Sequence, residues 1–592
     1  MSHLTEQLKK DIHYKESLNS CMNCGVCTAI CPSAEFYNYD PRIIADTVQR
    51  EDEYALETLL KSDTIWYCGE CMSCKTRCPR CNTPGGIIMA LRKLSQEKGL
   101  FTSSEKGRQQ YALKKVLGNN ILNYGYCVTP DVVKPEMHPE QGPVWEWIYT
   151  HRDEVYEKTH SNYRKTGAGT LRQVDNDSLD ELRAIFEVTG GKEFLDKIEA
   201  YSVKKAEEMG IDMENYFLHT YTDNNGKHSE KLKAKATMNL EGKQQIWKDY
   251  QKEIADDKYY YARSCIRQTF FPGSEWAYLD ILGNKLGKTV LDDPRHTTCT
   301  GIGYHSDVVP IETIMTVVAR HFALMTEAGF ENMTPSCITS FGIYTEILHT
   351  WETHPETEEK TREFLWKATK REFQKPKNLA HTSDIIYKFR NEIAAQKKYS
   401  LRDVHSGRPL QIVDHIGCHY AKMFPDKGIG GAEFPAVLSG MVTAWGGQSV
   451  DYPERRHCCG FGFRNYLIMA NRGFSVANSK KKFESMQPYE PDFIITNCPG
   501  CAMFLDKWQY TISEMEGTTY GKNGYGIPVL TYEEAAALVL GYDPWEIGLQ
   551  MHQVSVEPLL EKMGIDYDPE AKYKNIKGED MGQPACPTYL KV

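Results

Sequence analysis

Nineteen cysteines are the residues of this sequence most able to do chemistry. Eight of them form two runs with the same spacing, C-x2-C-x2-C-x3-C-P, which end at Pro32 and Pro79. Three thiolates at this spacing bind three irons of one 4Fe-4S cubane, and the fourth reaches across to a second cubane. The two runs therefore predict a pair of cubane clusters near the N-terminus.

The spacing assigns four cysteines to each cluster. The first cluster is bound by Cys21, Cys24, Cys27 and Cys78, and the second by Cys68, Cys71, Cys74 and Cys31. Zinc is the alternative metal that C-x2-C pairs can bind, but two complete runs with both prolines favour the clusters. Cys81 is a ninth thiol just past the second run, and we expect it not to be a ligand.

A second, dispersed set of five cysteines follows much later in the chain. It comprises Cys418, the adjacent pair Cys458 and Cys459, Cys498 and Cys501. Adjacent cysteines do not easily ligate one tetrahedral ion, and five thiolates exceed what a cubane or a zinc ion needs. A larger or opened cluster would use them, and Gly460, Gly462 and Gly500 would let backbone pack close to it.

Short apolar runs must position these cysteines. LQIVDHIGC ends at Cys418 and DFIITNC ends at Cys498. Runs of this length, β-branched and closed by glycine or proline, predict buried strands joined by crossover helices. We therefore expect an α/β domain with its cysteines at strand ends, where ligands gather in such folds.

This region also repeats itself. Three positions recur after 160 or 161 residues, pairing Cys299 with Cys459, Cys337 with Cys498 and Ser340 with Cys501. The repeat predicts two similar half-domains that arose by internal duplication.

The first half-domain keeps three cysteines, Cys265, Cys299 and Cys337, and has Thr298 and Ser340 where the second has Cys458 and Cys501. Three thiolates cannot reproduce the five-cysteine set. They are a candidate site for an ordinary iron–sulfur cluster or a zinc ion, helped by Ser340 or by the nearby His296. An empty site is the alternative.

These observations predict a multidomain α+β and α/β protein. Its parts are a helical dicluster ferredoxin domain of bacterial type at 1–100, a helical connector at 101–254, the half-domains at 255–400 and 401–545, and an extension at 546–592. In the connector, Ser178 and Glu181 form a candidate capping box, and Gly190 is expected to end the helix that follows. Cys127 and Cys586 stand alone and are expected to be free structural thiols.

The five-cysteine set resembles the CCG domain of heterodisulfide reductases, and residues 1–100 resemble the small dicluster subunit of the same complexes. The resemblance implies a natural fusion of the dicluster C subunit and the CCG-domain B subunit. It also implies that the five cysteines hold a noncubane 4Fe-4S cluster, where a disulfide is split. Thr298 and Ser340 depart from the family pattern. This departure argues against a mechanism that needs two noncubane clusters.

Two functions fit this pattern. In the first, the chain is an oxidoreductase subunit that passes electrons from a flavoprotein similar to heterodisulfide reductase A, through the cubanes, to a small disulfide or dithiol at the noncubane cluster. His419 and His457 are then candidate proton donors, and hydrogen bonding to backbone or cluster sulfur is their alternative role. In the second, the chain is a noncatalytic electron-transfer subunit of a quinone-linked flavin oxidoreductase of the succinate/fumarate, glycolate or glycerol-phosphate type.

Composition limits the partners. The net charge is -10 and no sustained Lys/Arg run occurs, so we expect no nucleic-acid partner. We find no signal peptide and no run of about 18 apolar residues that could span a bilayer. Together with cysteines suited to a reducing compartment, this predicts a cytoplasmic protein that reaches a membrane only through partners.

Overall fold

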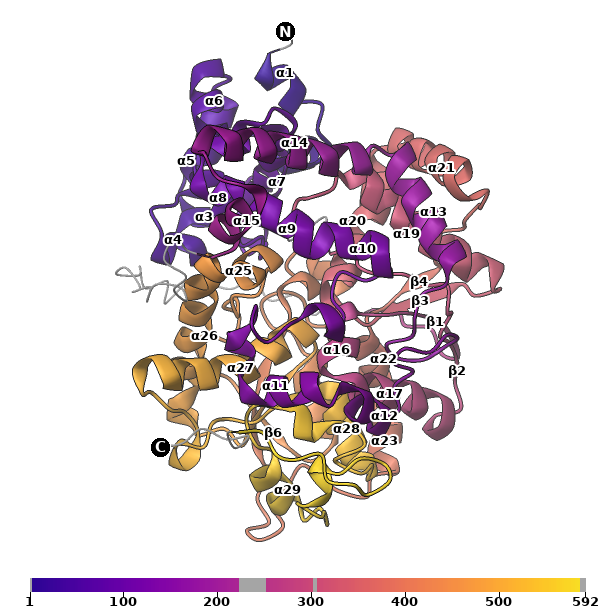
Figure 1. Cartoon of the computed structure of the whole chain (residues 1–592). Helices are drawn as coiled ribbons and strands as arrows, with labels where there is room; N and C mark the ends of the chain where they lie inside the picture. The colour runs from indigo at the N-terminus through magenta and orange to yellow at the C-terminus, as the bar shows by residue number, and fades with distance from the viewer. Residues whose placement is uncertain (1–2, 223–251, 302–305, 586–592) are drawn as a thin grey trace.

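The computed structural model describes residues 3–222, 252–301 and 306–585 (Figure 1). Cys586, which we expected to be a free thiol, lies outside them. Within the described residues, buried apolar side chains from Leu8 to Met581 form one continuous core. The predicted domains therefore pack against one another and share this core.

Short helices surround the two N-terminal cysteine runs. Pro32 takes the first position of its helix, with Cys31 as the N-cap, where the missing N–H of proline costs nothing. The last helix of the region is buried along nearly its whole length, and four others pack against it. In chain order the helices are α1 (Leu4–Leu8), α2 (Ile12–Ser17), α3 (Val26–Ala29), α4 (Pro32–Phe36), α5 (Pro41–Gln49), α6 (Glu53–Leu60) and α7 (Pro84–Glu97).

The connector is helical, as predicted, and it spreads over the rest of the molecule (Figure 1). Its helices are α8 (Glu105–Arg108), α9 (Gln110–Leu113), α10 (Asn119–Tyr124), α11 (Gly142–Thr150), α12 (Arg152–Lys158), α13 (Asn176–Val188), α14 (Gly191–Met209) and α15 (Met213–Tyr221). Helix α14 contacts α7, while α11 contacts α27 (Pro499–Glu516) in the second half-domain. The connector thus braces the N-terminal helices against the later domains.

The predicted capping box in the connector is wrong. Asp175, not Ser178, caps helix α13, because its carboxylate accepts the Ser178 N–H at 2.8 Å. Glu181 is drawn away into ion pairs with Arg320 and Arg371, each at 2.7 Å. Gly190 ends the helix as expected, with a left-handed φ of 81°.

The first half-domain is a parallel four-stranded sheet in the order β2-β1-β3-β4. Its strands are β1 (Lys258–Ala262), β2 (Thr289–Leu291), β3 (Asn332–Pro335) and β4 (Asn378–Leu379). Its helices are α16 (Cys265–Phe270), α17 (Pro272–Asp280), α19 (Ile311–Glu327), α20 (Ile338–Thr353), α21 (Pro355–Thr369), α22 (Thr382–Lys388) and α23 (Arg390–Ala395).

The second half-domain has the equivalent parallel order, β6-β5-β7-β8. Its strands are β5 (Gln411–His415), β6 (Gln448–Val450), β7 (Phe493–Thr496) and β8 (Val529–Thr531). Its helices are α24 (Val437–Ala444), α25 (Phe463–Leu467), α26 (Arg472–Met486), α27 (Pro499–Glu516) and α28 (Tyr532–Leu540), and α29 (Glu557–Met563) follows in the C-terminal segment. The matching sheets confirm the predicted fold class and its duplicated α/β part.

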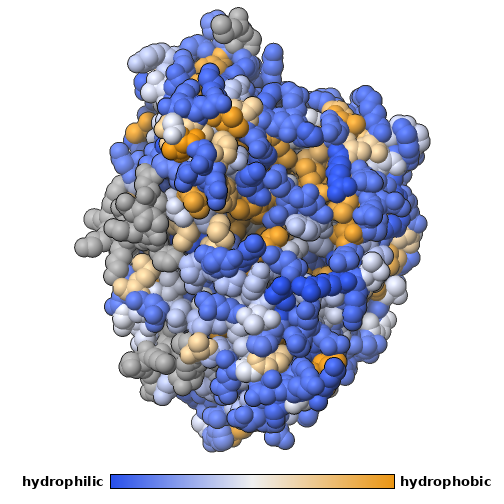
Figure 2. Space-filling view, in the orientation of Figure 1, coloured by the Kyte–Doolittle hydropathy of each residue, from blue (hydrophilic) through white to orange (hydrophobic). Residues whose placement is uncertain are grey.

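Among the described residues, we find no helix that is both long and apolar enough to cross a bilayer. Figure 2 shows a mainly hydrophilic face, with apolar side chains gathered in its upper half.

The close packing of α17 against the C-terminal segment yields a stability prediction. A Cβ added at Gly273 would lie 2.3 Å from the backbone carbon and oxygen of Ile547, and overpacking of this kind costs about 1–3 kcal/mol. Gly273→Ala should therefore lower the midpoint of thermal unfolding. Gly283→Ala is the matched control, since nothing lies within 4 Å of its added Cβ. Equal midpoints for the two variants would contradict this packing.

Candidate functional site

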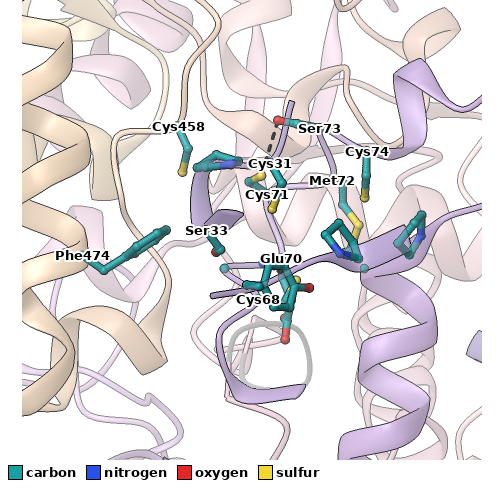
Figure 3. A pocket seen from close by; sticks show the side chains of 16 residues that line it. Cys31, Ser33, Cys68, Glu70, Cys71, Met72, Ser73, Cys74, Cys458 and Phe474 are labelled. Atoms are coloured by element: carbon teal, nitrogen blue, oxygen red, sulfur yellow. Dashed lines mark hydrogen bonds between the residues drawn. The ribbon is translucent and has the colours of Figure 1, made fainter. Parts of the chain in front are cut away.

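The eight N-terminal cysteines line two cavities, four in each, and the two groups are the ones that the sequence assigns to the two clusters. One cavity is lined by Cys31, Cys68, Cys71 and Cys74 (Figure 3), and the other by Cys21, Cys24, Cys27 and Cys78. We call them the inner and the outer cavity. Cys81 is exposed and lines neither.

Each run bends at equivalent positions. Asn23 and Glu70, two residues after the first cysteine of each run, have left-handed φ angles of 59° and 50°. This conformation turns their N–H groups onto the first sulfur, with N···Sγ distances of 3.4 Å to Cys21 and to Cys68. Backbone N–H groups aimed at sulfur stabilise thiolates, which are the forms that bind iron.

The two cavities differ in exposure. In the outer cavity, Cys24 is exposed and the side chain of Met22 is 61% exposed. In the inner cavity, Glu70 and Met72 are each 2% exposed. The outer cavity therefore has exposed residues in its lining, whereas the inner cavity is bordered by buried side chains although its four cysteines are partly exposed.

The five cysteines of the later set line a third cavity, which we call the five-cysteine cavity: Cys418, Cys458, Cys459, Cys498 and Cys501. Each sits where a parallel strand ends or a loop follows one. Cys418 follows β5, Cys498 follows β7 as the N-cap of α27, and Cys501 lies in the first turn of that helix.

Glycines let the backbone close around this cavity, as the sequence indicated. Gly460 has a φ of 89°, and a Cβ there would lie 2.6 Å from the Cα of Ser475. A Cβ at Gly500 would lie 2.7 Å from the ring of Phe461, which lines the cavity. Larger residues at either position would push the wall inward.

The inner and five-cysteine cavities share a wall. Cys458 lines both, and Figure 3 shows it on a loop facing the cysteines of the N-terminal region. Cys71 also lines both. The hydrogen bond with Cys458 lowers the pKa of Cys71 to about 5, whereas burial raises that of Cys68 to about 12.

The half-buried Lys422 lies at this wall. The Lys422 ammonium donates to Ser73 Oγ at 2.8 Å and to the Arg456 carbonyl at 2.8 Å, and it lies 3.7 Å from Cys418 Sγ. The pKa of Cys418 is lowered, first by a hydrogen bond with Cys458 and then by this cation. Sequence reasoning missed Lys422, because its partner Ser73 belongs to a distant segment and no local pattern marks such a contact.

The two predicted proton donors make structural hydrogen bonds. His419 lines the five-cysteine cavity, but its Nε2 pairs with the Glu70 carbonyl oxygen at 2.8 Å, and burial lowers its pKa to about 4. His457 Nε2 pairs with Asn478 Oδ1 at 2.7 Å, and burial holds its pKa well below the ordinary value. Both environments favour the neutral ring.

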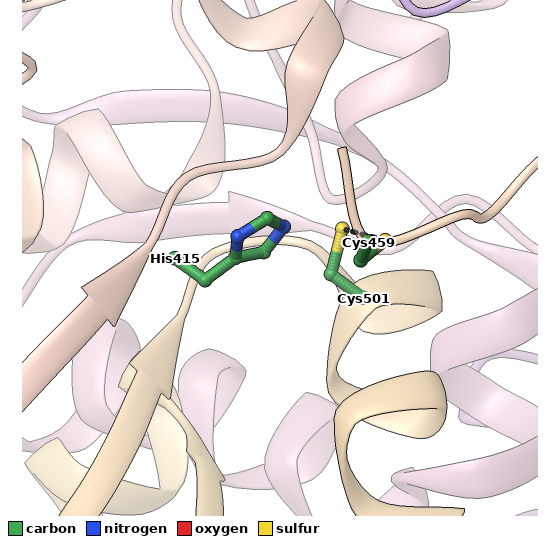
Figure 4. A group of neighbouring side chains, drawn as sticks. All are labelled: His415, Cys459 and Cys501. Carbon is green, nitrogen blue, oxygen red and sulfur yellow. Dashed lines mark hydrogen bonds between the residues drawn. The ribbon is translucent and has the colours of Figure 1, made fainter. Parts of the chain in front are cut away.

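A third histidine, His415, was missed. Its ring and the sulfurs of Cys459 and Cys501 offer ligand atoms that all lie within 4.8 Å of one another (Figure 4). It is the last residue of β5 and is buried. Its place at the end of a predicted strand, three residues before Cys418, is the signal that could have found it.

The first half-domain gathers its three cysteines, and Cys299 couples electrostatically with both Cys265 and Cys337. Ser340 hydrogen-bonds through its hydroxyl to Thr300 Oγ1 at 3.0 Å. His296, the other expected helper, packs against other aromatic rings, with a centroid separation of 4.0 Å to His321.

Cys127 is a free, buried thiol, as expected. Its thiol interacts with that of Cys299, although the two lie far apart in sequence.

The fold and the cysteine groups define an iron–sulfur protein in which a dicluster domain joins a cysteine-rich α/β domain. The chain matches the family model of the 4Fe-4S dicluster domain over residues 17–82 and that of the cysteine-rich domain over residues 412–506. The dicluster domain implies two 4Fe-4S clusters, and the eight thiols with their N–H donors fit them.

Relatives match the two ends of the chain separately. The chain is 27% identical over 321 residues to the B subunit of the ferredoxin:CoB-CoM heterodisulfide reductase of Methanosarcina acetivorans, covering 53% of this chain and 98% of that protein. It is 33% identical over 189 residues to the C subunit of the same organism's reductase, covering 32% of this chain and 69% of that protein. The C2 subunit of the H(2)/formate:CoB-CoM heterodisulfide,ferredoxin reductase of Methanococcus maripaludis is 38% identical over 98 residues, 17% of this chain and 51% of that protein.

The chain belongs to the heterodisulfide reductase-like family and joins the counterparts of the C and B subunits in one polypeptide.

The position of Lys422 yields a redox prediction. In the iron-loaded protein, Lys422→Met should lower the reduction potential of a neighbouring centre on the order of 100 mV, because losing a half-buried cation beside the thiolates makes adding an electron less favourable. A redox titration followed by electron paramagnetic resonance measures it. Lys427→Met is the control, since that side chain is 53% exposed. A shift no larger than that of the control would mean that Lys422 does not tune the site.

Proposed function

We propose that this chain is the iron–sulfur subunit of a heterodisulfide reductase-like complex, in which electrons move between a flavoprotein partner and a small disulfide or dithiol. The observation that carries the proposal is the shared wall: Cys458 and Cys71 line both the inner cavity and the five-cysteine cavity. Centres held on either side of such a wall would exchange electrons without domain movement.

The proposed ligands follow the cavities. Cys21, Cys24, Cys27 and Cys78 bind the outer cubane, Cys68, Cys71, Cys74 and Cys31 bind the inner cubane, and the five-cysteine cavity binds a noncubane 4Fe-4S cluster. When bound, these clusters would supply single-electron transfer and, at the last of them, disulfide chemistry. The five-thiol set, four of whose members are buried, supports this assignment, because five thiolates in one cavity exceed the needs of a cubane or a zinc ion.

Residues around the five-cysteine cavity would stabilise the negative charge of its thiolates. Lys422 offsets the negative charge of thiolates at Cys418 and Cys71, whose electrostatic influence raises its own pKa against the effect of burial. Phe461 lines the cavity beside Cys459, and Phe474 lines the inner cavity beside Cys458, so both rings help to exclude water. A dry site strengthens each of these electrostatic interactions.

Protons are the second requirement, because reducing one disulfide to two thiols consumes two electrons and two protons. His415 is placed better for this than His419 or His457, since it faces the sulfurs of Cys459 and Cys501. Burial lowers the pKa of His415, so the resting ring is neutral and would have to take up a proton before it passed one to a thiolate. The hydrogen bonds of His419 and His457 support the structural roles that were their alternative.

Electrons would enter at the outer cavity. Cys24 and Met22 are exposed there, and Ile43, next in sequence to the cavity-lining Arg42, is 54% exposed. This surface is the proposed contact for a flavoprotein similar to heterodisulfide reductase A or to a flavin dehydrogenase.

A second candidate function is a noncatalytic electron-transfer subunit of a quinone-linked flavin oxidoreductase. It is favoured by the first half-domain, where Thr298 replaces one cysteine and Ser340 hydrogen-bonds to Thr300 in place of another. A flavin dehydrogenase that co-purifies with the chain, without activity toward any small disulfide, would support this candidate over the first.

The first candidate predicts the effect of one thiol. In the complex isolated with its flavoprotein, Cys459→Ala should reduce the dye-linked turnover of disulfide or dithiol substrates by at least about 100-fold, because a cluster ligand is lost. Iron analysis should show about 12 irons per wild-type chain, the sum for three 4Fe-4S clusters.

Cys81→Ala is the matched control, since this exposed thiol lines none of the three cavities. Disulfide turnover that survives Cys459→Ala at the control level would contradict the proposed catalytic role.

A further inference from the structure

The two adjacent cysteines of the five-cysteine cavity face different neighbours. Cys458 also lines the inner cavity, whereas the sulfur of Cys459 lies 3.3 Å from that of Cys501. The Gly460 N–H, next in the chain, donates to Cys458 Sγ at 3.3 Å. Because the two side chains branch from neighbouring Cα atoms, the backbone around them decides where each sulfur lies. We call residues 454–460 the cysteine-pair loop.

One face of helix α26 binds the backbone of this loop. Its buried polar residues lie at positions i, i+3, i+4 and i+7 and share one side of the helix: Ser475, Asn478, Ser479 and Lys482. Ser475 Oγ donates to the Gly460 carbonyl at 2.7 Å. Ser479 Oγ donates to the Cys459 carbonyl at 2.8 Å. The two hydroxyls therefore hold the end of the loop that carries the cysteine pair.

Lys482 holds the other end of the loop. Its side chain is fully buried. Its ammonium donates to the carbonyls of Glu454 at 2.5 Å, Arg455 at 3.2 Å and His457 at 3.1 Å. A lysine ammonium has three donors, so each of them has one carbonyl partner in the loop. Because a buried cation without partners is strongly destabilising, the charge of Lys482 and the conformation of the loop depend on each other.

The internal repeat offers an independent comparison, because α19 is the counterpart of α26 in the first half-domain. At either spacing of the repeat, 160 or 161 residues, the positions that match the two serines and the asparagine are buried and apolar in α19. They are Met315, Val318 and Ala319 at one spacing and Ile314, Val317 and Val318 at the other. The position of Lys482 is taken by Phe322 or His321, and neither has an ammonium. The hydroxyl, amide and ammonium groups of this face thus accompany the complete cysteine pair and are missing where Thr298 replaces its first member.

We propose that Lys482 is a positioning residue of the five-cysteine site. With the two serines of the same face, it holds the cysteine-pair loop so that Cys458 reaches the wall shared with the inner cavity while Cys459 meets Cys501. The hydrogen bonds of its ammonium go to backbone carbonyls, so it acts through the loop and not on the thiols themselves. The inference rests on the proposed function, which assigns a cluster to these thiols.

Hydrogen exchange and electron paramagnetic resonance of the full chain, purified without oxygen, test the proposal. Lys482→Met keeps most of the apolar bulk but removes all three donors, so amide exchange in the cysteine-pair loop should rise at least about tenfold. The resonance signal of the centre in the five-cysteine cavity should change its g values, while the signal of the outer cluster stays unchanged. Lys480→Met is the matched control on the same helix: this lysine is 31% exposed, pairs with Glu516 and should give wild-type results.

A milder variant covers the case in which Lys482→Met does not fold. Ser479→Ala removes only the hydrogen bond to the Cys459 carbonyl and should raise loop exchange about threefold, with a change in the same resonance signal. Loop exchange and signals equal to those of Lys480→Met would overturn the proposal, and so would faster exchange spread evenly over the second half-domain with an unchanged signal. A wild type with about 8 irons would instead contradict the proposed third cluster, and loop exchange alone would then decide the inference.

Discussion

A half-buried lysine ammonium links the two halves of the site. Lys422 belongs to the second half-domain, where it hydrogen-bonds to the Arg456 carbonyl and lies beside Cys418, and it also donates to Ser73 of the N-terminal region. A charge held away from water is costly unless its donors have partners, and Ser73 is the partner that docking of the N-terminal region supplies. Docking therefore completes the hydrogen bonding of Lys422, and His419 adds a second link between the two regions through the Glu70 carbonyl.

The grouping of the cysteines and the duplicated sheets could be predicted, because both depend on short-range patterns. Ligand spacing within each N-terminal run, and apolar runs that lead into Cys418 and Cys498, are local features of the sequence. The strand order β2-β1-β3-β4 and its equivalent β6-β5-β7-β8 agree with the predicted repeat.

The missed residues depend on contacts between distant segments. The connector beside Cys127 is attached to the first half-domain by the hydrogen bond from the Thr298 N–H to the Gly125 carbonyl, and no local pattern carries that information. Lys422 is similar, since its partner Ser73 lies in the N-terminal region. The cap of α13 was misplaced for the same reason: Glu181 is held by Arg320 and Arg371 from the first half-domain, so Asp175 caps the helix alone.

The difference in exposure between the outer and inner cavities also decides which of the two centres would be oxidised first. Oxidants act first on sulfur that solvent reaches, and Cys24 is exposed while the four inner cysteines are only partly exposed. Oxidative damage would begin at the outer centre and isolate the others from their electron donor before it consumed them. A preparation exposed briefly to air would then retain most of its iron and yet be electrically disconnected.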